Sequence, residues 1–232
     1  MSKILESIYE GEIPEELSMF TYAELIKFVE DGFGKLDSDF KVSKFAEYEK
    51  NIVAFSGAKT FQEAKDLSNF VFNDKGEKRA FKEFKEFALS IDEQYNITWL
   101  KTEQDTAFGM SQSADAWIDI EEDADIFPYL QYQTADDERV RHSHKAWDNI
   151  IRPVDDNFWT NHMPLNGYRC RCRVKKLTEG KASSLRGIKK NDDPMFNINP
   201  GKVDYIFNEK KHPYFKHTKK EDAAFKKAVG WR

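Results

Sequence analysis

Apolar residues recur every three or four positions over most of the first half of the chain, which is the period of helices that bury one face. The pattern predicts helices over residues 21–31, 42–55, 60–70, 78–95 and 96–123. The clearest of them is 78–95, where one face carries Phe81, Phe84, Phe87, Ala88 and Ile91. A stripe of this kind fits a partner groove or a core face, and we favour the core face.

Local signals set the expected helix ends. Thr21 is a plausible N-cap, and Gly32 and Gly34 are expected to end that helix. The pair 56–57 (Ser-Gly) is expected to separate two helices, the second of which would open with a capping box of Thr60 and Glu63. The sequence Asn-Asp-Lys-Gly at 73–76 predicts a turn.

After Pro128 the period changes to two. Residues 129–134 and 170–174 alternate and are expected to form paired strands, with a short helix near 143–149 between them and another near 221–229. The predicted fold class is α+β: a predominantly helical N-terminal part followed by a small mixed α/β lobe with a short sheet. We expect four segments: 1–55 helical or linking, 56–128 helical, 129–215 the lobe, and 216–232 a tail.

Charge and composition narrow the functional class. The chain has 232 residues, 36 basic and 41 acidic side chains, and a net charge of -5. This balance disfavours a dedicated nucleic-acid binder, although the lysines of the tail allow weak contact with DNA. We see no apolar stretch that would span a bilayer and no signal peptide at the N-terminus, so a reduced, cytoplasmic environment is expected.

Residues 136–174 hold most of the chemistry-bearing side chains. Both cysteines, three of the five histidines and two of the five tryptophans lie there. His144, Cys170 and Cys172 are candidate zinc ligands, because zinc prefers imidazole and thiolate. The candidates for a fourth ligand are His142, His162 and Asp137.

A packing role for the same residues is favoured over a metal site, so no cofactor is the leading expectation. In that interpretation Cys170 and Cys172 lie on a short strand with at least one thiol buried. The alternating arginines on the other side would then pair with nearby carboxylates and fix the intervening loop; they are Arg169, Arg171 and Arg173, facing Asp136, Asp137, Asp155 and Asp156.

Enzymatic alternatives find less support. His144 near Asp148 with a downstream cysteine is the raw material of a Cys–His pair. However, no sharp-turn nucleophile motif, phosphate-binding loop or H-E-x-x-H motif is present. His212 and His217 among lysines suggest a nuclease-like tail, but a solvated terminal face explains them more simply.

Three islands of sequence carry a family resemblance. They read D-E-R-V-R-H-S-H-K-A-W-D (137–148), P-V-D-D-N-F-W (153–159) and P-L-N-G-Y-R-C-R-C-R-V (164–174). Their order and spacing resemble the Mu F-like minor head proteins of tailed bacteriophages, also called head-morphogenesis proteins. The resemblance runs from about residue 55 to residue 215 and includes H-P-Y-F at 212–215.

The resemblance assigns a structural motif residue by residue. The matching positions are Asp137, Arg139, Arg141 and His144 in the first island, Asp156, Phe158 and Trp159 in the second, and Pro164, Asn166, Gly167, Cys170, Arg171 and Cys172 in the third. The chain departs from the family pattern at four loop positions. His142 and Leu165 stand where prolines are usual, Asn149 where a glycine is usual, and Tyr168 where a tryptophan is usual.

The resemblance implies a low-copy virion protein rather than an enzyme. Such a protein is made in the host cytoplasm, associates with the portal and other head proteins, and enters the capsid interior, where it can aid DNA packaging or ejection. Some relatives carry C-terminal toxin domains, and the short sequence after H-P-Y-F is expected to leave no room for one. The alternative is a delivered effector or nuclease-like enzyme acting on nucleic acid.

Overall fold

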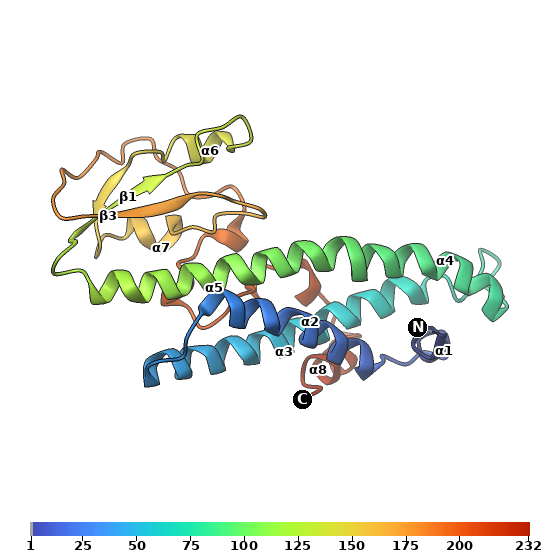
Figure 1. Cartoon of the computed structure of the whole chain (residues 1–232). Helices are drawn as coiled ribbons and strands as arrows, with labels where there is room; N and C mark the ends of the chain where they lie inside the picture. Colours follow the sequence, from blue (N-terminus) through green and yellow to red (C-terminus); the bar gives the residue numbers. More distant parts are fainter. Residues whose placement is uncertain (1) are drawn as a thin grey trace. The chain divides into compact units, whose positions relative to one another are not determined.

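The structure is a computed structural model that describes residues 2–232, and helices dominate it (Figure 1). The elements, in chain order, are α1 (Ser2–Tyr9), α2 (Glu15–Phe33), α3 (Asp39–Ser68), α4 (Phe81–Glu93), the π-helix η1 (Gln94–Trp99), α5 (Leu100–Glu122), β1 (Tyr129–Gln133), α6 (His142–Lys145), β2 (Ile151–Pro153), α7 (Phe158–His162), β3 (Arg173–Leu177), three short 3₁₀ helices η2 (Pro194–Phe196), η3 (Pro200–Lys202) and η4 (Pro213–Phe215), and α8 (Asp222–Val229). A helical N-terminal part is thus followed by a small antiparallel sheet, which confirms the predicted fold class.

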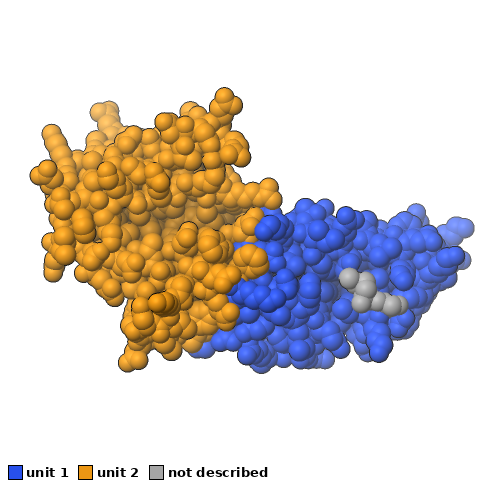
Figure 2. Space-filling view, viewed as in Figure 1, with its two compact units in different colours: residues 1–27, 49–104, 207–232 blue, residues 28–48, 105–206 orange. Residues whose placement is uncertain are grey.

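The chain forms two compact units (Figure 2). Unit 1 comprises residues 1–27, 49–104 and 207–232, and unit 2 comprises residues 28–48 and 105–206. Helices α2, α3 and α5 each contribute residues to both units. The four consecutive segments expected from the sequence are a different kind of division and stay a prediction.

In unit 1, α1 and α4 pack on the C-terminal half of α3. Phe84 and Ala88 of α4 are fully buried in a cluster with Leu5, Ile8 and Leu67. The aromatic stripe of α4 is therefore a core face, as predicted. Phe87 lies at its margin: the side chain is 42% exposed and stacks on Phe70.

Helix α3 corrects two sequence predictions. It runs unbroken through residues 56–57, and Thr60 lies in its interior rather than at an N-cap. Gly57 is needed for packing and does not end a helix: a Cβ there would lie 2.0 Å from the carbonyl oxygen of Ala228 in α8. Similarly, α2 begins at Glu15, directly after Pro14, so Thr21 is no cap. It ends at Phe33, after Gly32.

Replacing Gly57 with alanine should destabilise the protein even though alanine favours helices by about 1 kcal/mol. The new methyl group meets backbone atoms of α8, which cannot rotate away, so we expect a net loss of about 1–3 kcal/mol in urea denaturation. Gly109→Ala is the matched control, because its Cβ would meet only the mobile end of Leu165, at 3.2 Å. Equal stabilisation of both variants would contradict the packing argument.

The three-stranded sheet of unit 2 has the order β2-β1-β3, with both neighbours antiparallel to β1. Leu130 and Tyr132 alternate toward one face and are 0% exposed. They pack in the main core of unit 2, with Trp117 from α5, Trp147, Phe158 and Trp159. Strand β1 confirms the prediction for residues 129–134.

The second predicted strand is shifted along the chain. Residues 173–177 form β3 and pair with β1, with Val174 opposite Tyr132. Cys170 and Cys172 precede the strand, so they lie in a loop and not on the sheet. Helix α8 confirms the predicted C-terminal helix, and the turn at 73–76 is also confirmed, with Gly76 at φ +77°.

Candidate functional site

Several of the chemistry-bearing side chains of residues 136–174 lie around α6 in unit 2. Two turn contacts position this short helix. The Asp148 carboxylate accepts hydrogen bonds from the backbone and the hydroxyl of Thr134, at 2.7 and 2.9 Å. Asn149 has φ +61°, a conformation that glycine and asparagine tolerate best, and its N–H donates to the Tyr132 carbonyl. This explains how asparagine replaces the glycine that is usual in the resembling family.

His144, Cys170 and Cys172 converge as the sequence suggested. The Nδ1 atom of His144 lies 3.7 Å from Sγ of Cys170 and 3.5 Å from Sγ of Cys172. One donor atom from each of the three residues lies within 4.8 Å of the others. The imidazole is 1% exposed and stacks on the Trp147 ring, with centroids 4.8 Å apart. Both cysteines are free thiols and half-buried.

The two thiols are in hydrogen-bond contact with each other. The hydrogen bond with Cys172 lowers the pKa of the Cys170 thiol to about 4, and it raises the pKa of Cys172 above its ordinary range.

The three candidates for a fourth ligand lie outside this cluster. His162 is buried, and its ring nitrogens bond the backbone carbonyls of Phe158 and Lys189, at 2.8 and 3.1 Å. His142 is exposed, and Asp137 is bonded to Arg171. Among the described residues, no further His, Cys, Asp or Glu joins the three donors.

A bidentate ion pair locks the loop that carries the thiols. Arg171 donates to the two Asp137 oxygens at 2.5 and 2.7 Å, and this contact holds the pKa of Asp137 down at about 2. Arg141 donates to the Tyr168 carbonyl at 2.7 Å, and its guanidinium lies against Gly167, where a Cβ would come within 3.1 Å of it. The loop is therefore held from both sides of Cys170.

Only part of the predicted ion pairing is present. The Arg171–Asp137 pair is confirmed, but the predicted partners for Asp156 were wrong: Asp156 pairs with Arg152, four residues earlier. Arg173 Nε donates to the Gln133 side chain instead of a carboxylate. Arg152 was missed because it lies inside β2, outside the arginine-rich stretch that drew attention.

The remaining motif residues build the interior of the lobe. Phe158 and Trp159 are buried core residues, and the Trp159 indole donates to the Pro153 carbonyl. Asn166 is also buried: it accepts from the Tyr132 hydroxyl at 2.9 Å and donates to the Met163 carbonyl. The Pro164 carbonyl accepts from Ser113 of α5. Arg139 is the exception, since its side chain is largely exposed.

A groove of about 790 Å³ runs beside the thiol loop within unit 2. Its lining is mostly apolar, with Phe28 of α2, Phe108 of α5 and Leu165 among the contributors. Cys170, Cys172 and the arginines 169, 171 and 173 line one side. Its size would admit a ligand, but Arg171, one of the charged groups in its lining, is already bonded to Asp137.

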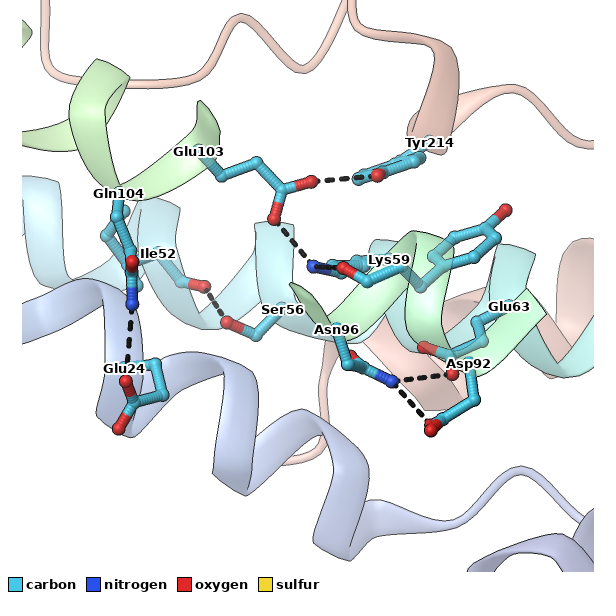
Figure 3. Close-up of polar contacts among 11 residues, drawn as sticks. Glu24, Ile52, Ser56, Lys59, Glu63, Asp92, Asn96, Glu103, Gln104 and Tyr214 are labelled. Carbon is cyan, nitrogen blue, oxygen red and sulfur yellow. Dashed lines mark hydrogen bonds and ion pairs between the residues drawn. The ribbon is translucent and has the colours of Figure 1, made fainter. Parts of the chain in front are cut away.

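Unit 1 contains a second polar cluster that the sequence analysis did not identify (Figure 3). Lys59 of α3 is 0% exposed and donates to Glu103 of α5 at 2.6 Å and to the Tyr95 carbonyl at 2.8 Å. That carbonyl lies in η1, where it also accepts from the N–H of Leu100. The other Glu103 oxygen accepts from the Tyr214 hydroxyl at 2.8 Å.

Glu63 and His212 lie next to this ion pair. Glu63 is 1% exposed and accepts from Asn96 at 2.8 Å, and burial raises the pKa of its carboxyl to about 8. His212 packs edge-on against Phe55, and burial lowers its pKa to about 4. The H-P-Y-F stretch thus belongs to the interior of unit 1, so neither His212 nor Tyr214 is part of an exposed nuclease-like tail.

Comparisons with known proteins find similarity over part of the chain. The family model described as "Phage Mu protein F like protein" matches residues 64–175. The chain is similar to "Putative capsid assembly protein F" of Escherichia phage Mu, with 38% identity over 80 residues that make up 34% of this chain and 17% of that protein. It is also similar to "Mu-like prophage FluMu F protein" of Haemophilus influenzae, with 36% identity over 92 residues, 40% of this chain and 21% of that protein.

The two similar proteins come from a phage and from a Mu-like prophage. Together they support a Mu F-like family for the matched part of the chain, residues 64–175. The match covers a minor part of each relative, because the chain spans about a fifth of their length. No solved structure gives a significant match. Within residues 2–232, no helix combines the length and apolar character required to cross a membrane.

Proposed function

We propose that the chain is a minor head protein of a tailed phage, a structural component that associates with the portal and other head proteins during assembly. In this role it is made in the host cytoplasm, enters the virion head and lies at the capsid interior. Two observations support the proposal: the Mu F-like match over residues 64–175, and the similarity to a protein named for capsid assembly.

The geometry of unit 2 supports a structural role. Several motif side chains form hydrogen bonds within the unit. Asn166 bonds Tyr132, Arg171 bonds Asp137, and Trp159 bonds the Pro153 carbonyl. Groups used in this way make a lobe rigid and leave few unpaired donors for a substrate. A rigid lobe can keep a binding surface in one shape and so avoid an ordering cost when a partner binds.

The same observations disfavour the delivered nuclease or effector. Its best candidates were the histidines of the tail, and His212 is buried beside Lys59 and Tyr214. His217 stacks on Phe225 and contacts Asp222. Weak contact of the lysine-rich tail with packaged DNA, and a role in packaging or ejection, remain expectations from the resemblance.

Co-expression with the portal protein of the same genome tests the proposal. We expect the two proteins to elute together in size-exclusion chromatography, and the chain to be found in purified particles by mass spectrometry. Separate elution at micromolar concentrations, together with its absence from particles, would refute the proposed function.

Variants of the loop lock refine this test. Arg171→Ala removes the bidentate contact with Asp137, so we expect faster amide hydrogen exchange at residues 169–173 and less co-elution with the portal protein. The double charge reversal Asp137→Arg/Arg171→Asp should restore both. Arg186→Ala, at an exposed arginine of unit 2 that follows β3, is the matched control and should change neither.

A further inference from the structure

The Nδ1 atom of His144 and the sulfurs of Cys170 and Cys172 lie close together in unit 2. Nδ1 of an imidazole has one lone pair or one proton, and two sulfurs lie within 3.7 Å of it. A single hydrogen bond can serve only one sulfur well. A cation at the common point would satisfy the nitrogen and both sulfurs together.

The separations fit a particular geometry. Zinc binds sulfur at about 2.3 Å and imidazole nitrogen at about 2.0–2.1 Å in a tetrahedron, which places nitrogen and sulfur ligands about 3.6 Å apart. The two distances from His144 Nδ1 to the sulfurs are 3.5 and 3.7 Å. All three donor atoms lie within 4.8 Å of one another, as ligands of one ion must.

We propose that His144 Nδ1, Cys170 Sγ and Cys172 Sγ bind one zinc ion, which joins α6 to the loop before β3. The donor set selects the metal: two thiolates and an imidazole suit zinc, whereas magnesium and calcium require oxygen ligands. Both cysteines and His144 are half-buried or buried, so ion binding would not require an exposed, water-filled site.

The surroundings are preorganised for thiolate ligands. The Arg171–Asp137 pair fixes the residue between the two cysteines, and Arg141 fixes the backbone at Tyr168. A small cavity of about 20 Å³, lined by Arg139, Val140 and Arg141, adjoins the three donors. It has room for a water molecule as the fourth ligand but not for a substrate.

The test is a metal analysis of the full chain, produced in zinc-containing medium and purified without chelators, with both thiols kept reduced. We expect inductively coupled plasma mass spectrometry to find about one zinc ion per chain. The variant Cys170→Ser/Cys172→Ser should lower the zinc content roughly tenfold or more. His142→Asn, at the exposed histidine two residues before His144, is the matched control and should keep the metal.

A second measurement does not depend on the folding of variants. Metal-free wild-type chain is titrated with Co²⁺, and coordination by thiolates should produce a sulfur-to-cobalt charge-transfer band that excess zinc removes. Zinc below roughly 0.1 per wild-type chain, no cobalt band, or unchanged zinc in the double cysteine variant would each overturn the proposal. The outcome is independent of portal binding, so it is separable from the proposed function.

Discussion

Lys59→Met is expected to destabilise unit 1 by about 3–5 kcal/mol in chemical denaturation at neutral pH. Lys59 is completely buried and is bonded to Glu103 and to the Tyr95 carbonyl. Removal of the ammonium group leaves a buried carboxylate without its cation, next to Glu63, which is also buried. The cost is therefore the burial of an uncompensated charge rather than the loss of one contact.

Two further variants make this expectation specific. Lys59→Met/Glu103→Gln should lose less than the sum of the two single changes, because the second substitution removes the uncompensated charge. The control is Lys65→Met on the same helix. The Lys65 side chain is 40% exposed and pairs with Glu221, so we expect little change in the free energy of unfolding. Strict additivity of the Lys59 and Glu103 effects would show that the pair is not coupled.

Glu63 gives the same cluster a pH dependence with a definite sign. Its folded pKa of about 8 is above the ordinary value of 4.5, so between these values the folded chain holds a proton that the unfolded chain has lost. Its contribution to stability is complete below about pH 4.5 and declines as the pH rises to about 8. Glu63→Gln should flatten this decline in urea denaturation series, and an unchanged slope would contradict it.

Trp147→Ala should cost about 3–5 kcal/mol and loosen the lobe of unit 2. The indole is 1% exposed and contacts His144, His162 and Tyr132, with ring centroids 4.8, 4.7 and 5.7 Å away. Its N–H also donates to the Lys189 carbonyl at 3.1 Å. The substitution therefore leaves a large cavity and removes one of the two hydrogen bonds made by the Lys189 carbonyl.

The control for Trp147 separates volume from hydrogen bonding. Trp147→Phe keeps most of the apolar contact but loses the N–H donor, so we expect the free energy of unfolding to fall by about 1–2 kcal/mol. Far-UV circular dichroism during urea denaturation measures this change. Equal losses for the alanine and phenylalanine variants would show that packing at this position contributes little.

The sequence predicted the elements whose signals are local. The face of Phe84 and Ala88 in α4, the alternation of Leu130 and Tyr132 in β1, and helix α8 depend on nearby residues, and all are present. The Arg171–Asp137 pair was also predicted, and the convergence of His144 with the cysteines had been considered as the alternative to a packing role, because the stretch is short and rich in unusual residues.

The missed features depend on residues far apart in the chain. Gly57 was predicted to end a helix because glycine often does so. The glycine is required there by the close approach of Ala228 in α8, which the local sequence does not reveal. Lys59 resembled an ordinary solvated lysine, and its partners are 44 residues away at Glu103 and, through Glu103, at Tyr214. The shift of β3 past the cysteines follows from its register on β1, which pairs Gln133 with Arg173.

The interleaving of the two units has a consequence for synthesis on the ribosome. Unit 2 ends at residue 206, whereas unit 1 also requires residues 207–232, including Tyr214 and the whole of α8. During translation, Lys59 and Glu103 are synthesised before Tyr214. The hydrogen bond from Tyr214 to Glu103 can therefore form only after residues 207–232 have been made. Unit 2 can therefore fold completely before unit 1, although unit 1 contains the first residues to be translated.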